Sequence, residues 1–291
     1  MYTGGFTGSF VMNREKYRNF TMGAPVRVAK YKMQCLGPKP PRGCDTKAAQ
    51  MEVPQGRGYD KVWRVTQGWL DMLPEKDAIG KEKLWESCAV VGNGGSLLLQ
   101  QKGDEIDRHE AVIRFNGGIV KGWEDHVGQR TTLRLANSQH LGFHEFEDEV
   151  IMQHVTMEGS MKGVIKYKSQ YPYTSLYITD GDFHQYVLDT VGDGAASNGF
   201  YGLCLALERC KKATLYGFYK DWEKMPGAKY HYYDDVEPND SQKRRDEGET
   251  PRFMDFVAKY PGFFQFGELD VGVGAVRRRL LGGRATVQLD H

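Results

Sequence analysis

Residues 88–118 read CAVVGNGGSLLLQQKGDEIDRHEAVIRFNGG, and this stretch decides the fold. Its apolar run Ala89–Val91 is typical of a buried strand, and a glycine-rich turn follows at Gly92–Ser96. Leu97–Leu99 can begin a helix, and Ala111–Phe115 predicts a second strand. The order strand, glycine turn, helix, strand opens many nucleotide-binding α/β sheets. Glycine lets the backbone come close to a phosphate or ribose, and a helix N-terminus there favours an anion.

The glycine spacing excludes two common nucleotide motifs. A G-x-G-x-x-G fingerprint that began at Gly92 and Gly94 would need glycine at position 97, where the chain has Leu97. The G-x-x-x-x-G-K-[ST] phosphate loop is absent as well. The residues therefore predict a nucleotide-binding α/β domain. A glycine turn that only lets a strand and a helix pack is the open alternative.

Composition narrows the class of protein. The chain has 291 residues, of which 40% are hydrophobic and 12% aromatic, as in a folded globular protein. Its 39 basic and 38 acidic residues leave no net field to recruit nucleic acid. We find no apolar run long enough to cross a bilayer and no signal-peptide pattern, so we expect any membrane attachment to depend on a targeting segment absent from this chain.

Residues 1–80 show little periodicity and many glycine and proline breaks. We expect an N-terminal stem or loosely packed extension there, with one helix near 62–73, and a catalytic domain over 81–291. The five cysteines are too irregular for a zinc site, although Cys35 and Cys44 could close a local loop. Two N-x-[ST] triplets would accept N-glycans if the chain meets a secretory lumen; they begin at Asn19 and Asn239.

A second strand–helix–strand unit is predicted within 192–218. Ser197 is a good helix cap, because its hydroxyl can accept from an exposed N–H. Ala213–Phe218 then predicts a strand that returns to the sheet. The helix N-terminus at Ser197–Gly199 could face a phosphate, although capped helices often bind nothing. Four residues follow the i, i+3, i+4, i+7 spacing of a helix with one buried face: Phe200, Leu203, Cys204 and Leu207.

The other segments give weaker signals. Arg130–Asn137 and Ser175–Thr179 are strand candidates. We expect the acidic stretch Glu145–Glu149 to be a solvated face or loop. Glu237–Glu249 is interpreted as a charged loop, followed by a helix over Arg252–Tyr260.

Three stretches resemble the sialylmotifs of the eukaryotic CMP-dependent sialyltransferase family. Motif L resembles 88–118, down to C-A-V-V-G-N and R-F-N, and is closest to the galactoside α-2,6 branch. Motif S resembles 197–218, and motif III resembles His231–Asp234. Over roughly residues 85–265 the resemblance implies a single Rossmann-like α/β domain of the GT-A type, with a mostly parallel sheet flanked by helices. It also implies a Golgi-resident glycoprotein without a D-x-D metal site or cofactor; the nearest D-x-D, Asp180–Asp182, is better interpreted as a turn.

The resemblance also implies roles for single residues. Asn93 and Asn116 would contact the CMP part of the donor. Ser197 and Gly199 would hold its ribose and phosphate region, with Asn198 where the family usually has Ser or Thr. The implied donor-binding set is Asn93, Gly94, Asn116, Ser197, Asn198, Gly199 and Tyr232.

The family resemblance also implies a catalytic residue and a disulfide bond. His231 would lie near the donor phosphate and help the nucleotide to leave. The family's disulfide between motifs would map to Cys88 and Cys210, which implies an oxidising lumen.

Two departures from the family pattern matter. Ala196 stands where motif S usually has proline. More seriously, the last motif, H-x-x-x-x-E, is missing, since the only histidine after His231 is His291. In the family that histidine deprotonates the acceptor hydroxyl. A carboxylate with a pKa raised by burial could replace it, and the candidates are Asp246, Glu247 and Glu249.

Three hypotheses follow. The first is an inverting, metal-independent transferase that moves sialic acid from CMP-sialic acid, or Kdo from CMP-Kdo, to a glycan acceptor, expected to be galactose-terminated. The second is a catalytically silent member of the same fold that binds a nucleotide or glycan. The third is an unrelated α/β enzyme such as a nicotinamide-dependent one, which the absent third glycine disfavours.

Overall fold

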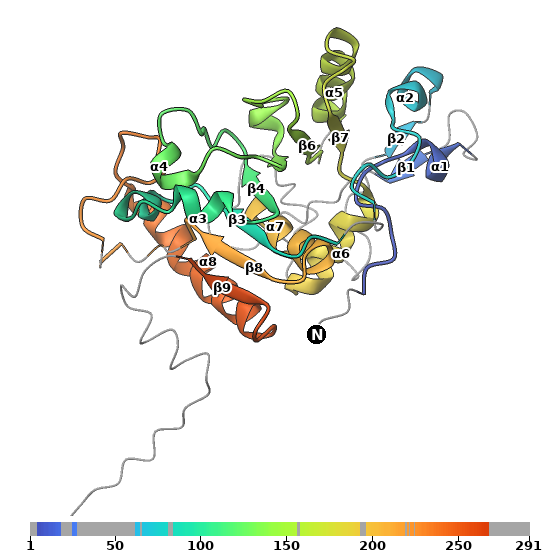
Figure 1. Ribbon diagram of the computed structural model, residues 1–291. Coiled ribbons are helices and arrows are strands. Elements are labelled where there is room, and N and C mark those ends of the chain that lie inside the picture. Colours follow the sequence, from blue (N-terminus) through green and yellow to red (C-terminus); the bar gives the residue numbers. More distant parts are fainter. Residues whose placement is uncertain are drawn as a thin grey trace, which may run out of the picture.

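A seven-stranded parallel sheet forms the centre of the described molecule (Figure 1). Its order is β7-β6-β5-β4-β3-β8-β9, and every neighbouring pair runs parallel. A computed structural model describes residues 5–18, 25–27, 62–64, 66–80, 84–155, 158–192, 196–218, 220, 222–223 and 225–267. The strands of the sheet are β3 (Cys88–Val91), β4 (Ala111–Phe115), β5 (Leu133–Ala136), β6 (Val150–Gln153), β7 (Leu176–Ile178), β8 (Ala213–Tyr216) and β9 (Phe264–Phe266).

Helices cover both faces of this sheet. On one face α7 packs against β3, β4 and β5 and against α6, while η2, α3 and α4 cover the other face. A separate antiparallel pair is formed by β1 (Pro25–Arg27) and β2 (Val62–Arg64). The helices are α1 (Arg14–Tyr17), α2 (Gln67–Met72), η2 (Gly95–Leu99), α3 (Gly103–Asp107), α4 (Glu124–Val127), η3 (Ser138–His140), α5 (Glu158–Gln170), α6 (Gly181–Val191), α7 (Asn198–Arg209) and α8 (Asp240–Ala258).

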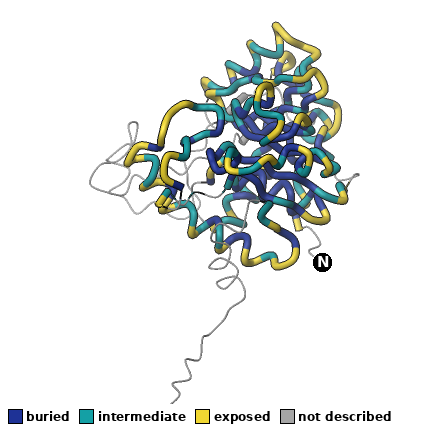
Figure 2. Tube along the Cα trace, turned by 60° about the vertical axis from the view of Figure 1, so that its left-hand side comes forward, coloured by how far each residue is buried: buried dark blue, intermediate teal, exposed yellow. Residues whose placement is uncertain are grey.

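The strand that begins the deciding stretch is buried on both faces. Cys88 and Val90 of β3 belong to the apolar cluster under α7, whereas Ala89 and Val91 pack with the opposite layer. Such two-sided burial explains the continuous apolar run, because strands of covered parallel sheets do not alternate with polar residues. Figure 2 shows the buried part of the trace gathered in the interior, with exposed segments around it.

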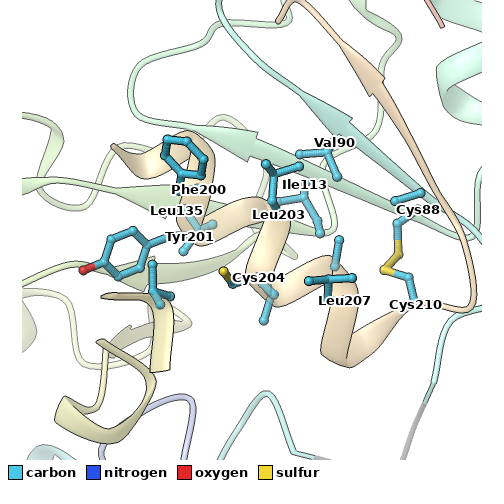
Figure 3. Close-up of a cluster of buried hydrophobic side chains, with 14 of the residues drawn as sticks. Cys88, Val90, Ile113, Leu135, Phe200, Tyr201, Leu203, Cys204, Leu207 and Cys210 are labelled. Atoms are coloured by element: carbon cyan, nitrogen blue, oxygen red, sulfur yellow. A yellow bond between two sulfur atoms is a disulfide. The ribbon is translucent and has the colours of Figure 1, made fainter. Parts of the chain in front are cut away.

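Helix α7 confirms the second predicted unit and is buried more completely than its spacing suggested. Phe200, Leu203, Cys204 and Leu207 pack toward strand residues such as Val90, Ile113 and Leu135 (Figure 3). Tyr201, Leu205 and Ala206 are buried as well, so the helix is covered on nearly all sides. The layer of α6 against α7 provides the extra cover.

The charged segment before residue 250 was interpreted wrongly. Residues 240–258 form the single helix α8, with Asn239 as N-cap and Gln242 completing a reciprocal capping box. The helix is polar along its first half and buries Phe253, Phe256 and Val257 in its second half. Its apolar periodicity therefore begins only where the predicted helix began.

The described parts of the N-terminal segment are not loosely packed. Phe6, Phe10 and Val11 belong to the main core, and Trp69 and Leu70 pack into a second apolar cluster. The predicted helix near 62–73 is found as α2, preceded by β2. The domain boundary near residue 80 stays a prediction. The predicted features at Cys35, Cys44 and Asn19 lie outside the described residues.

Candidate active site

The strand order reverses beside β3, and the predicted donor-binding residues gather at this point. From β3 the chain adds β4, β5, β6 and β7 on one side, and then returns to place β8 on the other side. Val91 is in register with Arg114 of β4 and with Tyr216 of β8, so these three strands end at one level. Ligands of open parallel sheets bind outside the carboxyl ends of the strands at such a reversal.

The glycines after β3 serve close contacts within the protein. The N–H of Gly94 donates to the carbonyl of Gly217 over 3.2 Å, and a Cβ at Gly94 would lie 2.6 Å from that oxygen. A Cβ at Gly95 would lie 2.0 Å from the carbonyl oxygen of Lys229. The turn after β3 thus touches both the turn after β8 and the segment before His231. The sequence predicted that the backbone here comes close to a phosphate or ribose. In the structure its close contacts include two other segments of the chain, at Gly217 and Lys229.

The segment that resembles motif III is docked on this turn. Gly94 and His231 form an antiparallel bridge, and the N–H of Tyr232 donates to the carbonyl of Asn93 over 3.0 Å. The side-chain amide of Asn93 donates to the carbonyl of Phe115 over 3.2 Å and lies 3.3 Å from the hydroxyl oxygen of Tyr233. Asn93 therefore joins the ends of β3 and β4 to this segment.

Tyr232 and Tyr233 differ in their exposure to any ligand. The Tyr232 side chain is buried, and its hydroxyl donates to the carbonyl of Ile119, which favours a packing role. Tyr233 is only partly buried. Its burial and the negative charge of Asp234 raise its pKa to about 12, so its hydroxyl keeps its proton at neutral pH.

Asn116 joins three elements at the reversal point. Its Oδ1 accepts from the N–H of Asn137 after β5 (3.0 Å) and from the side-chain amide of Asn198 at the start of α7 (2.8 Å). Its φ of 50° is the only positive φ of a non-glycine residue in the described ranges. Asparagine tolerates this left-handed conformation better than most residues. With its oxygen satisfied by the protein, the Nδ2 hydrogens of Asn116 are the group that a ligand would use.

Arg134 supports the same turn through hydrogen bonds to its carbonyls, a role that was not predicted from the sequence. Its buried guanidinium donates to the carbonyls of Asn116 (3.1 Å) and Gly118 (2.8 Å). It also pairs with the buried carboxylate of Glu149 over 2.8 Å. The expectation of a solvated acidic stretch is therefore wrong for Glu149, which neutralises a buried arginine. Glu145 is also engaged, since its carboxylate accepts from the N–H of Val120 over 2.7 Å.

The N-terminus of α7 lies next to Asn116. Ser197 occupies the N-cap position as predicted, but its hydroxyl makes no capping hydrogen bond. Ser197 is exposed, and Asn198 and Gly199 are partly exposed. The first turn of this twelve-residue helix thus presents N–H groups and the positive end of the helix dipole without a side-chain cap.

His231 is held in a defined orientation. Its Nδ1 lies 2.5 Å from Oδ2 of Asp234, and its ring stacks on Tyr233 with centroids 5.1 Å apart. An ionised carboxylate can only accept, so Nδ1 carries a hydrogen and Nε2 is left for other partners. About a third of the His231 side chain is exposed, at 34%.

The three carboxylates proposed as bases lie on α8 in different surroundings. Asp246 is buried, and its two oxygens accept from Nζ of Lys220 (2.8 Å) and from Nε1 of Trp222 (3.2 Å). Glu249 is partly buried with an oxygen 4.0 Å from the same Lys220 amine, and Glu247 is exposed. The assignment of a base among them stays a prediction.

The family follows from a match over most of the chain. The model of glycosyltransferase family 29, the sialyltransferases, matches residues 46–178 and 174–248. The chain belongs to this family. The β-galactoside α-2,6-sialyltransferase 1 of Mus musculus is 37% identical over 120 residues, which cover 39% of this chain and 30% of that protein. The β-galactoside α-2,6-sialyltransferase 2 of Gallus gallus is 28% identical over 204 residues, which cover 58% and 38%.

Solved structures agree on the fold. A crystal structure of a mammalian sialyltransferase superposes with a TM-score of 0.50 at 21% sequence identity, covering 63% of this chain and 69% of the other. The predicted family and the predicted α/β fold with a mostly parallel sheet are therefore confirmed. The matches span 30% and 38% of the lengths of the two sequence relatives above.

The disulfide that the sialyltransferase resemblance implied is present. Cys88, the first residue of β3, is bonded to Cys210, the residue after α7, with Cα atoms 6.0 Å apart. This prediction is confirmed. The bond lies at the amino ends of β3 and β8, so it fastens the sheet at the edge opposite the candidate site (Figure 3). Cys204 is a buried free thiol.

Asp180 and Asp182 of the D-x-D triplet are engaged in the structure. Asp180 caps α6, accepts from the Tyr17 hydroxyl over 2.9 Å and pairs with Lys16 over 2.6 Å. In the described ranges no cluster of three His, Cys, Asp or Glu side chains is arranged to hold a metal ion. No helix of the same ranges combines the length and apolar character of a membrane span.

Proposed function

We propose that this chain transfers sialic acid from CMP-sialic acid to a glycan hydroxyl, with inversion and without a metal ion. The observation that carries the proposal is the convergence of Asn93, Asn116, the α7 N-terminus and His231 where the strand order reverses. These residues come from four segments, and hydrogen bonds join them into one frame.

The frame suits a nucleotide monophosphate ester. The free amide hydrogens of Asn116 suit the acceptor groups of CMP, while Asn93 fixes the turn beside it. The uncapped first turn of α7 at Ser197–Gly199 suits the phosphate, because its N–H groups and dipole favour an anion. CMP-Kdo carries the same nucleotide and is the alternative donor.

The transfer needs two kinds of assistance. The acceptor oxygen forms a bond to the anomeric carbon while the bond from that carbon to the phosphate oxygen breaks, and the electron pair leaves with CMP. The charge that develops on the phosphate needs stabilisation, which Nε2 of His231 as a hydrogen-bond donor and the α7 dipole would supply. The acceptor hydroxyl must lose a proton to a base, for which Asp246, Glu247 and Glu249 are the candidates from the sequence. CMP is a good leaving group, so the step does not require a metal.

The acceptor and the compartment are proposed from the relatives. Both relatives described above are named β-galactoside α-2,6-sialyltransferases. A further solved mammalian sialyltransferase is bound to Gal-beta-1-3GalNAc-ortho-nitrophenol. We therefore propose a galactose-terminated glycan as acceptor.

The Cys88–Cys210 bond fits an oxidising secretory lumen such as the Golgi. In that compartment Asn239 is a site to test for an attached glycan, and its Oδ1 caps α8 in the structure.

A direct assay tests this function. The purified protein is incubated with CMP-sialic acid or CMP-Kdo, with and without galactose-terminated acceptors, in the presence and absence of EDTA. We expect acceptor-dependent release of CMP and a glycosylated product that EDTA does not abolish. Binding of CMP without transfer from either donor would overturn the enzymatic proposal, and binding of NADH that CMP does not displace would overturn the nucleotide assignment.

A catalytically silent member of the family is the second candidate. It is favoured by the missing H-x-x-x-x-E motif and by the engagement of Asp246 with Lys220 and Trp222. Such a protein would bind CMP or a glycan in the same assay and would release no CMP from the donor.

A further inference from the structure

The proposed reaction lacks an obvious base, and the neighbourhood of His231 contains a second histidine. The missing family motif removes the usual imidazole, and both oxygens of Asp246 already accept hydrogen bonds. His140 ends the short helix η3, which follows β5 at the carboxyl edge of the sheet. It thus lies at the same edge as Asn116.

The His140 ring rests on the turn that carries Asn116. A Cβ at Gly117 would lie 2.8 Å from Nδ1 and 3.0 Å from Cε1 of His140, so the ring occupies the space left by the missing side chain. Its backbone is fixed by a 3.0 Å hydrogen bond from its N–H to the carbonyl of Asn137. Among the described residues neither ring nitrogen of His140 has a hydrogen-bond partner, and its side chain is only partly buried.

The charges around His140 favour the neutral ring. Partial burial lowers its pKa, and the positive charges of His231 and then Arg134 lower it further. His231 belongs to the segment docked on Gly94, and Arg134 belongs to β5 and donates to the carbonyl of Asn116. The two histidines therefore have different surroundings. Asp234 holds a hydrogen on Nδ1 of His231, whereas no carboxylate of the described residues pairs with His140. Two neighbouring histidines with such different partners are suited to opposite roles in proton transfer.

We propose that His140 is the general base that deprotonates the acceptor hydroxyl, at Nε2, the ring nitrogen that does not face Gly117. The role rests on the proposed transferase function. Nε2 takes the hydroxyl proton while the acceptor oxygen bonds to the anomeric carbon and the phosphate oxygen departs with the electron pair of the broken bond. His140 then returns the proton to water. His231 assists the departing phosphate on the other side of the reaction.

The first test is the substitution His140→Gln, with His144→Gln as the matched control. His144 lies four residues further along the chain, where its Nδ1 contacts the carbonyl of Gly142 over 2.8 Å. We expect His140→Gln to lower kcat for transfer about 100-fold or more, as is typical for loss of a general base. The dissociation constant of CMP should stay within about twofold, which a collapse of the site would not allow. His144→Gln should keep both values.

The pH profile separates a base from a packing residue. For the wild-type protein, kcat/KM should rise with pH through the lowered pKa of His140 and level off near neutrality, because only the neutral ring accepts a proton. His140→Gln should lose this acidic limb. Added imidazole should restore part of the activity to His140→Ala, which leaves room for it.

Gly117→Ala provides an independent check, because the new methyl group would displace the ring. It should reduce kcat in the wild-type background and cause no further loss on top of His140→Gln. Additive losses would mean that the methyl group obstructs the donor, and they would count against the role of His140.

If the wild-type protein transfers no sugar from either donor, the proposed function is wrong, and so is the assignment of His140 as its base. If the wild type is active and His140→Gln has the same kcat and pH profile, only the base assignment is overturned.

Discussion

The turns after β3 and β8 and the helix α8 lie in the same domain but constrain their sequences to very different degrees. At the turns, backbone meets backbone, and a methyl group at Gly94 or Gly95 would lie 2.6 Å or 2.0 Å from a carbonyl oxygen. On the first half of α8, most side chains are exposed and Asp246 is the buried exception. Positions with no free space keep a recognisable motif, whereas solvated helical positions accept many residues.

This difference explains why the donor half of the proposed site can be predicted from the sequence, whereas the acceptor half cannot. The donor half depends on glycines at which a Cβ would meet a carbonyl oxygen, as at Gly94 and Gly95, and on Asn116 with its left-handed backbone. The base needs only an imidazole or carboxylate at the right place, and the chain can supply it from another segment.

The strongest constraint outside the site is the disulfide between β3 and α7. Replacing Cys88 by serine should lower the free energy of unfolding by about 5 kcal/mol, since the bond closes a span of 122 residues in the chain-entropy model. Denaturant unfolding measures this, with Cys204→Ala, which removes a buried thiol without a bond, as control. Equal stabilities of the two variants would contradict the assignment. CMP affinity of the folded fraction should change little, because the bond lies at the far edge of the sheet.

Much of the fold could be predicted because its signals are local. The apolar runs of β3, β4 and β8 and the spacing of α7 are visible in the chain, and all four elements are present. The helix over 240–258 escaped prediction because its first half buries little. Strand β6, at Val150–Gln153, was not predicted either, because it has only four residues and follows an acidic stretch.

Long-range partners in the site could not be predicted. Glu149 is 15 residues from Arg134 in the chain, and no periodic pattern links them. A buried charge pair becomes apparent only once β5 and β6 are adjacent. The place of His140 in the site could not be predicted for the same reason, since its neighbours Gly117 and His231 come from distant segments.

Asn116 tests the donor half directly. Asn116→Ala should raise the dissociation constant of CMP at least about 30-fold, because it removes an amide donor and the two contacts that position it. Asn116→Gly relieves the strain of the φ of 50° but also lacks the amide. It should therefore bind CMP as weakly as Asn116→Ala while being more stable. Calorimetric titration with CMP measures the affinity, and a wild-type value in both variants would refute this placement of the donor.

Asp234 tests whether orientation of His231 matters for leaving-group assistance. Asp234→Asn removes the carboxylate next to Nδ1 and should lower kcat roughly 10- to 30-fold, with a smaller effect on KM. A donor with a better leaving group should be affected less, because it needs less assistance. Equal losses of kcat with CMP-sialic acid and with the donor that has the better leaving group would mean that Asp234 only stabilises the docked segment. Thermal unfolding of the variant would show that loss of stability.

The smallest effect on catalysis is expected at Asp246, and it bears most directly on the contrast between the two regions. Asp246→Asn keeps an oxygen for Trp222 and loses the charge opposite Lys220, whose side chain is still 25% exposed. The free energy of unfolding should fall by about 1 to 3 kcal/mol, less than for a fully buried pair, since water can reach the lysine. Transfer should slow by less than about threefold, because both oxygens of Asp246 already accept hydrogen bonds from Lys220 and Trp222. If Asp246→Asn instead abolished transfer together with the acidic limb of the pH profile, the base would belong to α8 after all. The charged half of that helix would then be as functionally constrained as the glycine turns.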